Sequence, residues 1–241
     1  MRFPAIAAAT LAACTTTKLG HVQATWAFAD IDANGQQTGA TCPPGFEYAA
    51  LHTALAAPDG SLVDPCIAVD SDCYIDVFEC GAGSGVSSGL PPQTYLSWLS
   101  IIEDDPMAMP FAVSEQQLFT ITDEDVQFET TVFENGGAFR FEWSLVGANS
   151  GQTLTCAQAG AATIDASVTI GTQQLASLTD CDAPFGYSAA LPPGSYTLAL
   201  DPLNGSHTPL GNQAATAPNL IGTSANAITD VGEVMLPIAG M

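Results

Sequence analysis

Cys80 to Leu99 reads C-G-A-G-S-G-V-S-S-G-L-P-P-Q-T-Y-L-S-W-L, and Cys181 to Leu200 reads C-D-A-P-F-G-Y-S-A-A-L-P-P-G-S-Y-T-L-A-L. The two stretches align without a gap. They are identical at nine pairs of positions: Cys80/Cys181, Ala82/Ala183, Gly85/Gly186, Ser87/Ser188, Leu90/Leu191, Pro91/Pro192, Pro92/Pro193, Tyr95/Tyr196 and Leu99/Leu200. An internal repeat of this kind predicts two copies of one structural unit, so it decides the architecture before any single motif does.

The repeat extends towards the N-terminus. Two further pairs match there: Trp26/Trp143 and Cys42/Cys156. The interval between the two shared cysteines is 38 residues in the first copy and 25 in the second, so the first copy carries an insertion, which includes Cys66 and Cys73. We therefore expect modules at residues 20–134 and 135–241, joined at Asn135-Gly136-Gly137, each long enough for its own core.

The composition and the apolar pattern of the chain predict an all-β fold. Short apolar runs alternate with turn residues, 22 of the 241 residues are glycine and 16 are proline, and no long helical periodicity appears. Phe139 to Trp143 alternates apolar and polar side chains, as a strand with one buried face requires. The expected strands are Val22 to Ala29, Phe46 to Ala54, Ile75 to Phe78, Thr94 to Ile101, Val126 to Phe133, Phe139 to Val146, Ala162 to Ile170, Ser195 to Leu200 and Gly232 to Ile238.

One run resembles a known family. Leu191 to Leu198 reads L-P-P-G-S-Y-T-L, which is similar to the L-P-x-G-x-Y signature of carboxypeptidase-regulatory-like, transthyretin-like β-sandwich modules. The likeness covers about a third of each module. It resembles most the tandem, cysteine-bearing versions found in envelope lipoproteins of Gram-negative bacteria. The resemblance implies two Ig-like or transthyretin-like sandwiches pinned by disulfides.

The N-terminus resembles a lipoprotein leader. Met1-Arg2 is a short positive region, Phe3 to Ala13 is apolar but too short to span a bilayer, and Leu11-Ala12-Ala13-Cys14 resembles a lipobox. The resemblance implies a signal peptide at residues 1–13, lipid chains, palmitate among them, on Cys14, and a tether at 14–19. Because Thr15 is not an aspartate, it also implies sorting to the outer membrane. The alternative is an ordinary secretory signal cut near Ala13.

Cysteine counting agrees with export. Assigning Cys14 to lipid leaves six of the seven cysteines, and the repeat reduces their fifteen pairings to one. No C-x-x-C motif occurs, and the three histidines, His21, His52 and His207, are scattered, so a zinc cluster is not indicated. The expected disulfides are Cys42–Cys80, Cys66–Cys73 and Cys156–Cys181.

The charge is strongly negative. There are 25 acidic and three basic residues, a formal net charge of −22, with 18 acids in residues 20–134 and seven in 135–241. Such a surface repels nucleic acid and anionic lipid headgroups, which excludes both as partners. Solubility explains the charge, and cation binding is the alternative.

One segment matches the start of a calcium loop. Asp30-Ile31-Asp32-Ala33-Asn34-Gly35 has the D-x-D-x-N-G pattern, so Asp30, Asp32 and Asn34 are candidate calcium ligands. The twelfth position would be Thr41, where the loop needs a glutamate. A hairpin turn on Asn34-Gly35 explains the pattern better. Further acids in the first module, Asp64, Asp70, Asp72 and Asp76, could add ligands, but solvation of a pinned loop is the simpler interpretation.

Catalytic motifs are weak. Gly85-Val86-Ser87-Ser88-Gly89 fits G-x-S-x-G, but a proline pair and a strand follow where a nucleophile elbow needs a helix. Nothing marks a carboxylate pair for glycoside hydrolysis. Trp26 and Trp143 are expected in the core, whereas Trp98 and Tyr74 could instead stack on sugars, although such aromatic residues are usually packed.

The sequence thus predicts a lipid-anchored protein of the bacterial outer membrane, periplasmic or surface-exposed. We expect a non-enzymatic binding or structural role, no cofactor, and a membrane contact only through the lipid. The expected partner is an envelope protein or a glycan. The alternatives are a calcium-stabilised adhesin or carbohydrate-binding module, and a small hydrolase that uses the acids of the first module's insertion.

Overall fold

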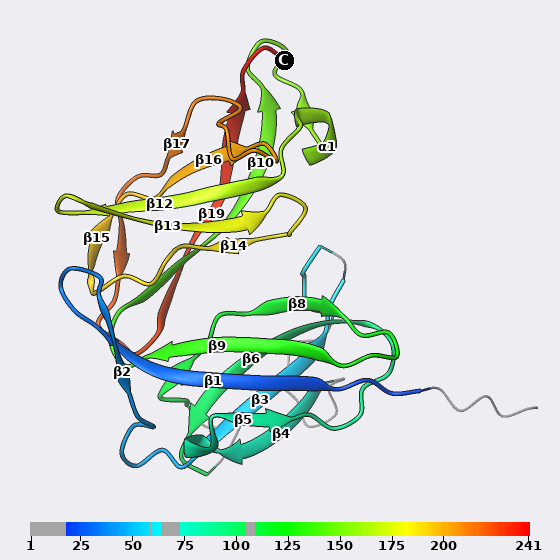
Figure 1. Ribbon diagram of the computed structural model, residues 1–241, viewed down its shortest axis with the longest axis vertical. Helices are drawn as coiled ribbons and strands as arrows, with labels where there is room; N and C mark the ends of the chain where they lie inside the picture. Colours follow the sequence, from blue (N-terminus) through cyan, green and yellow to red (C-terminus); the bar gives the residue numbers. More distant parts are fainter. Residues whose placement is uncertain (1–17, 58, 64–72, 105–108) are drawn as a thin grey trace, which may run out of the picture.

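The computed structural model describes residues 18–57, 59–63, 73–104 and 109–241 (Figure 1). It is almost entirely β, and the prediction of two tandem β-sandwich modules is confirmed. We call strands β1–β9 module 1 and strands β10–β19 module 2. The expected limits at residues 134 and 135 lie in the link between β9 and β10. The expected signal peptide lies outside the described residues, as does most of the tether.

Module 1 packs two sheets against each other. The first contains β1 (Val22–Ile31), β2 (Gln37–Ala40), β5 (Ser84–Val86) and β9 (Val126–Phe133). The second contains β3 (Tyr48–Leu55), β4 (Cys73–Glu79), β6 (Thr94–Ile102), β7 (Ala112–Val113) and β8 (Gln117–Thr120), and the short 3-10 helix η1 (Cys80–Ala82) follows β4. The core between the sheets contains the fully buried side chains of Leu51, Tyr95, Leu99 and Phe128.

Module 2 repeats this plan. Its first sheet contains β10 (Gly137–Gly147), β11 (Thr153–Leu154), β14 (Gly186–Tyr187) and β19 (Ala227–Ile238). Its second contains β12 (Thr163–Ile170), β13 (Gln173–Asp180), β16 (Ala199–Leu203) and β17 (Ala214–Ala215), and β15 (Gly194–Tyr196) pairs separately with β18 (Asn219–Ile221). Its core includes Phe139, Phe141, Leu200 and Leu236.

The strand pairings of the two modules correspond. β1 is antiparallel to β2 and β5 and parallel to β9, and β10 is antiparallel to β11 and β14 and parallel to β19. In the second sheets, β3 lies between β4 and β6 as β12 lies between β13 and β16. The sequence repeat is therefore a repeat of topology.

The repeated serine has the same structural task in both modules. The Ser87 hydroxyl accepts the Val22 N–H at 2.8 Å and donates to the Ser88 carbonyl at 2.9 Å. The Ser188 hydroxyl accepts the Phe139 N–H at 3.0 Å and donates to the Ala189 carbonyl at 2.8 Å. Both serines are buried, so each side chain satisfies a strand N–H that would otherwise lack a partner.

The repeated prolines and tyrosines form a second shared device. The Tyr95 hydroxyl donates to the Pro91 carbonyl at 3.0 Å, and the Tyr196 hydroxyl donates to the Pro192 carbonyl at 3.1 Å. A tyrosine that bonds back to the backbone a few residues upstream fixes a corner of many β-sandwiches. This contact explains why L-P-P-x-x-Y occurs in both copies.

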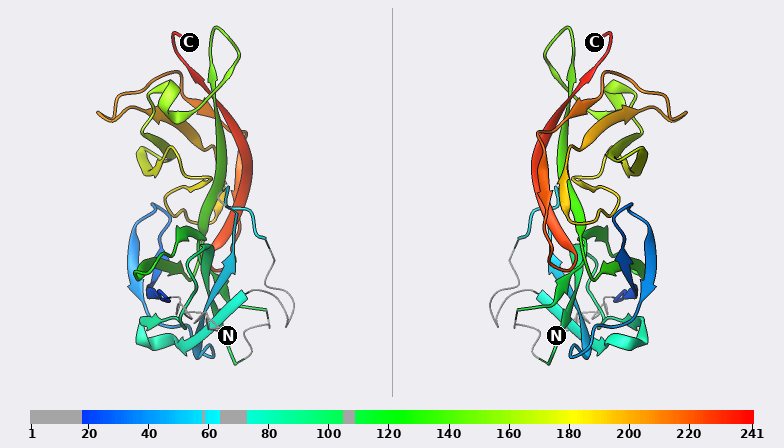
Figure 2. Two further views of the ribbon diagram at one scale, coloured as in Figure 1. Left: turned by 90° about the vertical axis from the view of Figure 1, so that its right-hand side faces the viewer. Right: turned by 90° about the vertical axis from the view of Figure 1, so that its left-hand side faces the viewer.

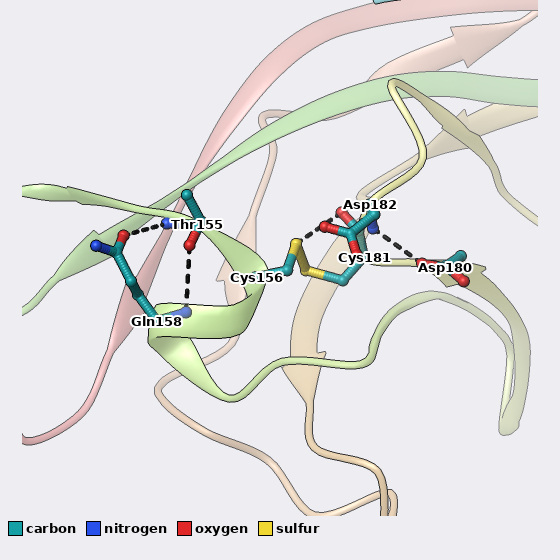
Figure 3. Close-up of a disulfide and its surroundings, with 6 residues drawn as sticks. All are labelled: Thr155, Cys156, Gln158, Asp180, Cys181 and Asp182. Carbon is teal, nitrogen blue, oxygen red and sulfur yellow. Dashed lines mark hydrogen bonds between the residues drawn. A yellow bond between two sulfur atoms is a disulfide. The ribbon is translucent and has the colours of Figure 1, made fainter. Parts of the chain in front are cut away.

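A disulfide pins a short helix in module 2. The helix α1 (Cys156–Ala159) begins with a capping box, in which the Thr155 hydroxyl accepts the Gln158 N–H and the Gln158 side chain accepts the Thr155 N–H (Figure 3). Its first residue, Cys156, is bonded to Cys181, with 5.9 Å between the two Cα atoms. The bridge ties α1 to the turn that follows β13.

Two expectations about strands need correction. The single strand expected at Ser195 to Leu200 is broken after Tyr196, because Thr216 bonds to the backbone of Leu198 and the chain then changes partner from β18 to β12. Residues 173–180, for which no strand was expected, form β13 along the edge of β12. The other expected strands are present, with ends that differ by a few residues.

The modules are stacked end to end (Figures 1 and 2). The described chain begins at module 1, and the C-terminus lies at the end of module 2 that is farther from module 1. In the link, Gly136 has a φ of +70°, and a Cβ there would collide with the Leu191 carbonyl. A Cβ on Gly137 would collide with the Ala227 carbonyl, so the link requires both glycines. Among the described residues, no helix is long and apolar enough to cross a membrane.

Candidate binding site at the joint between the modules

Two asparagines bond the modules together at the joint, by which we mean the surfaces where module 1 and module 2 touch. Asn226, which precedes β19, accepts the Phe133 N–H at 3.2 Å and donates to the Val113 carbonyl at 2.6 Å. It is buried with a φ of +43°, a conformation that asparagine tolerates better than most residues. Asn135 accepts from and donates to the backbone of Ile31. The start of β19 is thereby fixed to module 1.

Apolar side chains from both modules also pack at the joint. One cluster consists of Ala56 and Leu96 from module 1 and Phe185 from module 2, with Leu118 and Tyr187 packed against it. The other consists of Ala29, Ile31 and Phe133 from module 1 and Ala190 from module 2. Because these contacts bury apolar surface on both sides of the link, the modules are held in one relative orientation.

Arg140 is the one arginine among the described residues, and it is at the joint. Its guanidinium forms ion pairs with Glu142 at 2.9 Å and Asp230 at 3.0 Å and lies 4.6 Å from the centre of the Phe185 ring. The side chain is only 20% exposed. Arg140 is therefore neutralised by acids of its own module, and it supports the ring that packs against module 1.

The insertion of module 1 reaches module 2. The described part of the connection between β3 and β4 contains a turn in which the Gly60 N–H donates to the Ala57 carbonyl. A Cβ added to Gly60 would lie 3.0 Å from atoms of both Pro184 and Phe185. This turn therefore packs against the segment that leads into β14. The second copy has only two residues between the corresponding strands, β12 and β13.

Two cavities open along the joint. One, of about 510 Å³, lies between β1 and β9 of module 1 and residues 188–190 of module 2. The other, of about 600 Å³, lies between β8 of module 1 and residues 178–187 of module 2. Glu115 lines both cavities, so the two are adjacent. We refer to them together as the joint groove.

Glu115 is held firmly in the joint groove. The preceding residue is anchored to β6, because the Ser114 hydroxyl accepts the Leu99 N–H at 2.9 Å and donates to the Glu115 carbonyl at 2.9 Å. The following N–H, of Gln116, donates to the Tyr187 hydroxyl of module 2 at 3.0 Å. Burial raises the pKa of the Glu115 carboxyl to about 7. The groove thus contains a carboxyl group that changes its charge near neutral pH.

The groove lacks a positive charge of its own. Neither cavity is lined by a lysine, an arginine or a histidine of the described chain. Lys18 pairs with Asp123 and His21 with Asp125, at the far end of module 1. Burial raises the pKa of Tyr187 to about 12, so its phenol stays neutral. The joint groove therefore offers acids, hydroxyls and amides around one half-buried carboxyl group.

A further acid is fixed at the rim of the groove beside the second-module disulfide. Asp182, which lines the 600 Å³ cavity, donates its N–H to the Asp180 carboxylate at 2.9 Å (Figure 3). The residue between them, Cys181, forms the bridge to Cys156. The bridge therefore holds the turn that carries this acid.

Two of the three expected disulfides are present in the structure. Cys42 is bonded to Cys80 and Cys156 to Cys181, each with 5.9 Å between Cα atoms. Cys73 is also disulfide-bonded, but Cys66 lies outside the described residues, so the pairing of these two stays a prediction. Cys14, the proposed lipid site, lies outside them as well.

The calcium candidates form a turn. Asp32 accepts the N–H groups of Asn34 and Gln36 at 2.8 Å each, and its own N–H donates to the Gln36 carbonyl, which closes the hairpin between β1 and β2. Those two backbone bonds, that of Gln36 first, hold the pKa of Asp32 below its ordinary value. Asp30 lies on β1 and does not share these bonds. Across the described part of the chain, no three acids, histidines or cysteines gather as a metal site.

Of the four acids considered for a hydrolase, the structure describes only Asp76. Asp64, Asp70 and Asp72 lie outside the described residues. The Asp76 carboxylate accepts two hydrogen bonds from Ser88, one from its N–H at 3.0 Å and one from its hydroxyl at 2.6 Å. These bonds tie β4 to the segment after β5. With Ser87 buried in its bond to β1, the G-x-S-x-G segment is used for structure.

The aromatic candidates are packed. Tyr74 lies against the module 1 core, 6.3 Å from the Tyr95 ring, and Trp98 stacks on His52 at 5.1 Å. Trp26 is buried and donates from its indole N–H to the Cys80 carbonyl at 2.9 Å. Trp143 is partly buried against the module 2 core. Tyr74, Trp98 and Trp143 do not line the joint groove, whereas the buried Trp26 is among the residues that line its 510 Å³ cavity.

No family model matches the chain, and no curated protein matches it. Among solved structures, it is similar to a leucine-rich repeat protein from Bacteroides thetaiotaomicron, at 13% identity over 92% of this chain and 26% of that one, with a TM-score of 0.40. It is also similar to a streptococcal ancillary pilin, at 12% identity over 94% of this chain and 64% of that one, with a TM-score of 0.27. A third similar structure is a minor pilin of Streptococcus agalactiae, at 11% identity over 91% of this chain and 97% of that one, with a TM-score of 0.28. The chain thus spans about a quarter of the first protein. At these TM-scores the likenesses say nothing of function.

The joint groove is not predicted by any motif of the sequence. Glu115 is one acid among 25, and no motif surrounds it. One signal was present: Glu115 is the single charged residue between Asp105 and Asp123, in a run that is otherwise apolar or neutral. A charge isolated in such a run is a candidate for burial, and burial is what perturbs its pKa.

Proposed function

We propose that this protein is a lipid-anchored protein of the bacterial outer membrane that binds a partner in the joint groove and is not an enzyme. The observation that carries the proposal is the groove itself. It is formed by both modules, it contains a half-buried carboxyl group, and the contacts around it hold the modules together. Binding sites are commonly clefts between domains, with few fixed polar groups.

The disulfides support an exported location. Bridges of this kind form and persist in the periplasm and outside the cell, and are rare in a reducing cytosol. The bridge at Cys156–Cys181 stabilises the rim of the groove, so an oxidising compartment is also where the site is complete.

The described N-terminal residues support the proposed anchor. Lys18, near the end of the proposed tether, and His21, just after it, are held by Asp123 and Asp125 of the loop between β8 and β9. A lipid on Cys14 would therefore hold module 1 near the membrane. Module 2 lies beyond module 1 (Figure 2), so module 2 would lie further from the bilayer than module 1.

The anchor is tested by fractionation of a Gram-negative host that expresses the wild type and Cys14→Ser. The wild type should appear in the membrane fraction, with an intact mass above that of residues 14–241 by the mass of the lipid, because only a thiol carries the thioether. Cys14→Ser should be released or remain unprocessed, and Thr15→Ser should behave as the wild type. A soluble wild type with an unmodified N-terminus would refute the anchor.

A further inference from the structure

The Glu115 carboxylate is the most buried charge in the joint groove, and among the described residues it has no ion-pair partner. The charged and titratable residues that line the groove with it are Glu129 of β9, Asp182 before β14 and Tyr187 of β14. Arg140 is the β10 register partner of Tyr187 and is already paired with Glu142 and Asp230. An anion that is withdrawn from water without a cation beside it destabilises its surroundings.

A positively charged group of a ligand beside the Glu115 carboxylate would offset this destabilisation. We propose that the joint groove receives a lysine or arginine side chain of a partner protein, with the Glu115 carboxylate as the acceptor of its charge. The inference deepens the proposed function and rests on it. The ion pair would form where water is partly excluded, so it would be stronger than a pair on the open surface.

The lining of the groove fits such a side chain. A long basic side chain needs apolar contact for its methylene stem and anions for its head. Leu118 and Leu178 provide apolar surface in the 600 Å³ cavity, and Glu115 and Asp182 provide the negative charge. The Tyr187 hydroxyl, which accepts the Gln116 N–H, remains neutral and does not compete for the cation.

The charge of the whole protein would assist the encounter. With a net charge of −22, the chain attracts basic partners over a distance set by the ionic strength. That attraction is not specific, however, because most of the acids are exposed. Specificity must come from Glu115, whose ionisation near pH 7 distinguishes it from carboxylates that are ionised throughout the neutral range.

The test is a titration of the mature wild-type chain with a tetralysine peptide at pH 6, 7 and 8, at about 0.15 M salt. An exposed carboxylate with a pKa near 4 has a constant charge over this range, whereas a group of pKa about 7 goes from about one-tenth to nine-tenths ionised. The wild type should therefore bind about tenfold more tightly at pH 8 than at pH 6. Glu115→Gln should bind weakly and with almost no pH dependence.

The matched control is Glu233→Gln, which removes the same charge from an exposed position on β19. It should retain the pH dependence of the wild type, and melting curves should show that both variants are folded. Equal binding by Glu115→Gln and the wild type, or a wild-type affinity that does not change with pH, would overturn the inference. A negative result in this titration would not change the result of the membrane fractionation of Cys14→Ser. The proposed lipid anchor and the proposed binding of a basic side chain are therefore tested independently. Tighter binding of a neutral oligosaccharide than of the peptide, independent of Glu115, would assign the groove to a glycan instead.

Discussion

Two buried serine hydroxyls hold equivalent strands in the two modules, so one substitution can be tested twice. Ser188→Ala leaves the Phe139 N–H without a partner in the core, and we expect a loss of about 1–3 kcal/mol in the free energy of unfolding. Ser87→Ala should have a similar effect through Val22. Urea denaturation measures both. The control is Ser206→Ala, on an exposed turn, and a similar loss in all three variants would contradict the role of the buried hydroxyl.

His52 should make the stability depend on pH. The residue is 6% exposed, neither ring nitrogen has a hydrogen-bond partner in the described chain, and burial lowers its pKa to about 4. The unfolded chain therefore takes up a proton first as the pH falls, so the stabilisation present above about pH 6.5 is lost towards pH 4. The difference corresponds to at most about 3 kcal/mol.

Denaturation at pH 4.5 to 7.5 tests this dependence. The free energy of unfolding of the wild type should fall more steeply towards acid than that of His52→Phe, whereas His207→Gln, on an exposed turn, should follow the wild type. Parallel curves for the wild type and His52→Phe would show that the imidazole is not the group responsible.

The repeat predicted which residues matter in the cores but not what they do. Ser87, Ser188 and the tyrosines were identified as shared positions, yet their bonds to Val22, Phe139 and the prolines depend on strands that come together only in the fold. Glu115 could not be found by comparing the copies, because the cavity that it lines is formed between the modules.

At the scale of elements, the disulfide of module 2 should contribute measurably. The loop between Cys156 and Cys181 spans 25 residues, for which chain entropy predicts a loss of about 3 kcal/mol in Cys156→Ala. Chemical denaturation with and without a reductant gives the value. The double variant Cys156→Ala/Cys181→Ala excludes effects of the free thiol. An unchanged stability in both variants, or a Cys80–Cys156 peptide in non-reducing digests, would contradict the account.

The hairpin between β1 and β2 should be indifferent to calcium. The Asp32 carboxylate is occupied by backbone N–H groups, so we expect a chelator to leave the melting temperature unchanged. Asp32→Ala should lower the melting temperature equally with and without calcium. A melting temperature that rises with calcium concentration in the wild type, but not in Asp32→Ala, would establish a bound ion.

Elements were predictable where both copies or a clear alternation marked them. The strand around Phe139 was recognised from its alternation, whereas β13 was missed because its polar and small residues, Q-Q-L-A-S-L-T-D, give little contrast between its faces. The break after Tyr196 could not be read from the sequence, because it depends on Thr216, which lies about twenty residues further along the chain.

At the scale of the whole molecule, the two-module plan followed from the repeat, but the arrangement of the modules did not. Their orientation is set by single-copy features: the insertion that carries Gly60, the side chain of Asn226 and the ring of Phe185. A comparison of the two copies cannot reveal contacts that each copy makes only once. The joint groove therefore became visible only in the assembled structure.

The central claim, that the joint groove is where the anchored protein binds its partner, can be tested directly by photocrosslinking in cells. A photoreactive residue replaces Gln116, which lines the groove, or Gln174, an exposed position of β13 outside it. The account predicts one discrete crosslinked species from position 116, absent from position 174 and lost when Glu115→Gln is added. A species that forms equally at both positions, or that persists without the Glu115 carboxylate, would contradict it.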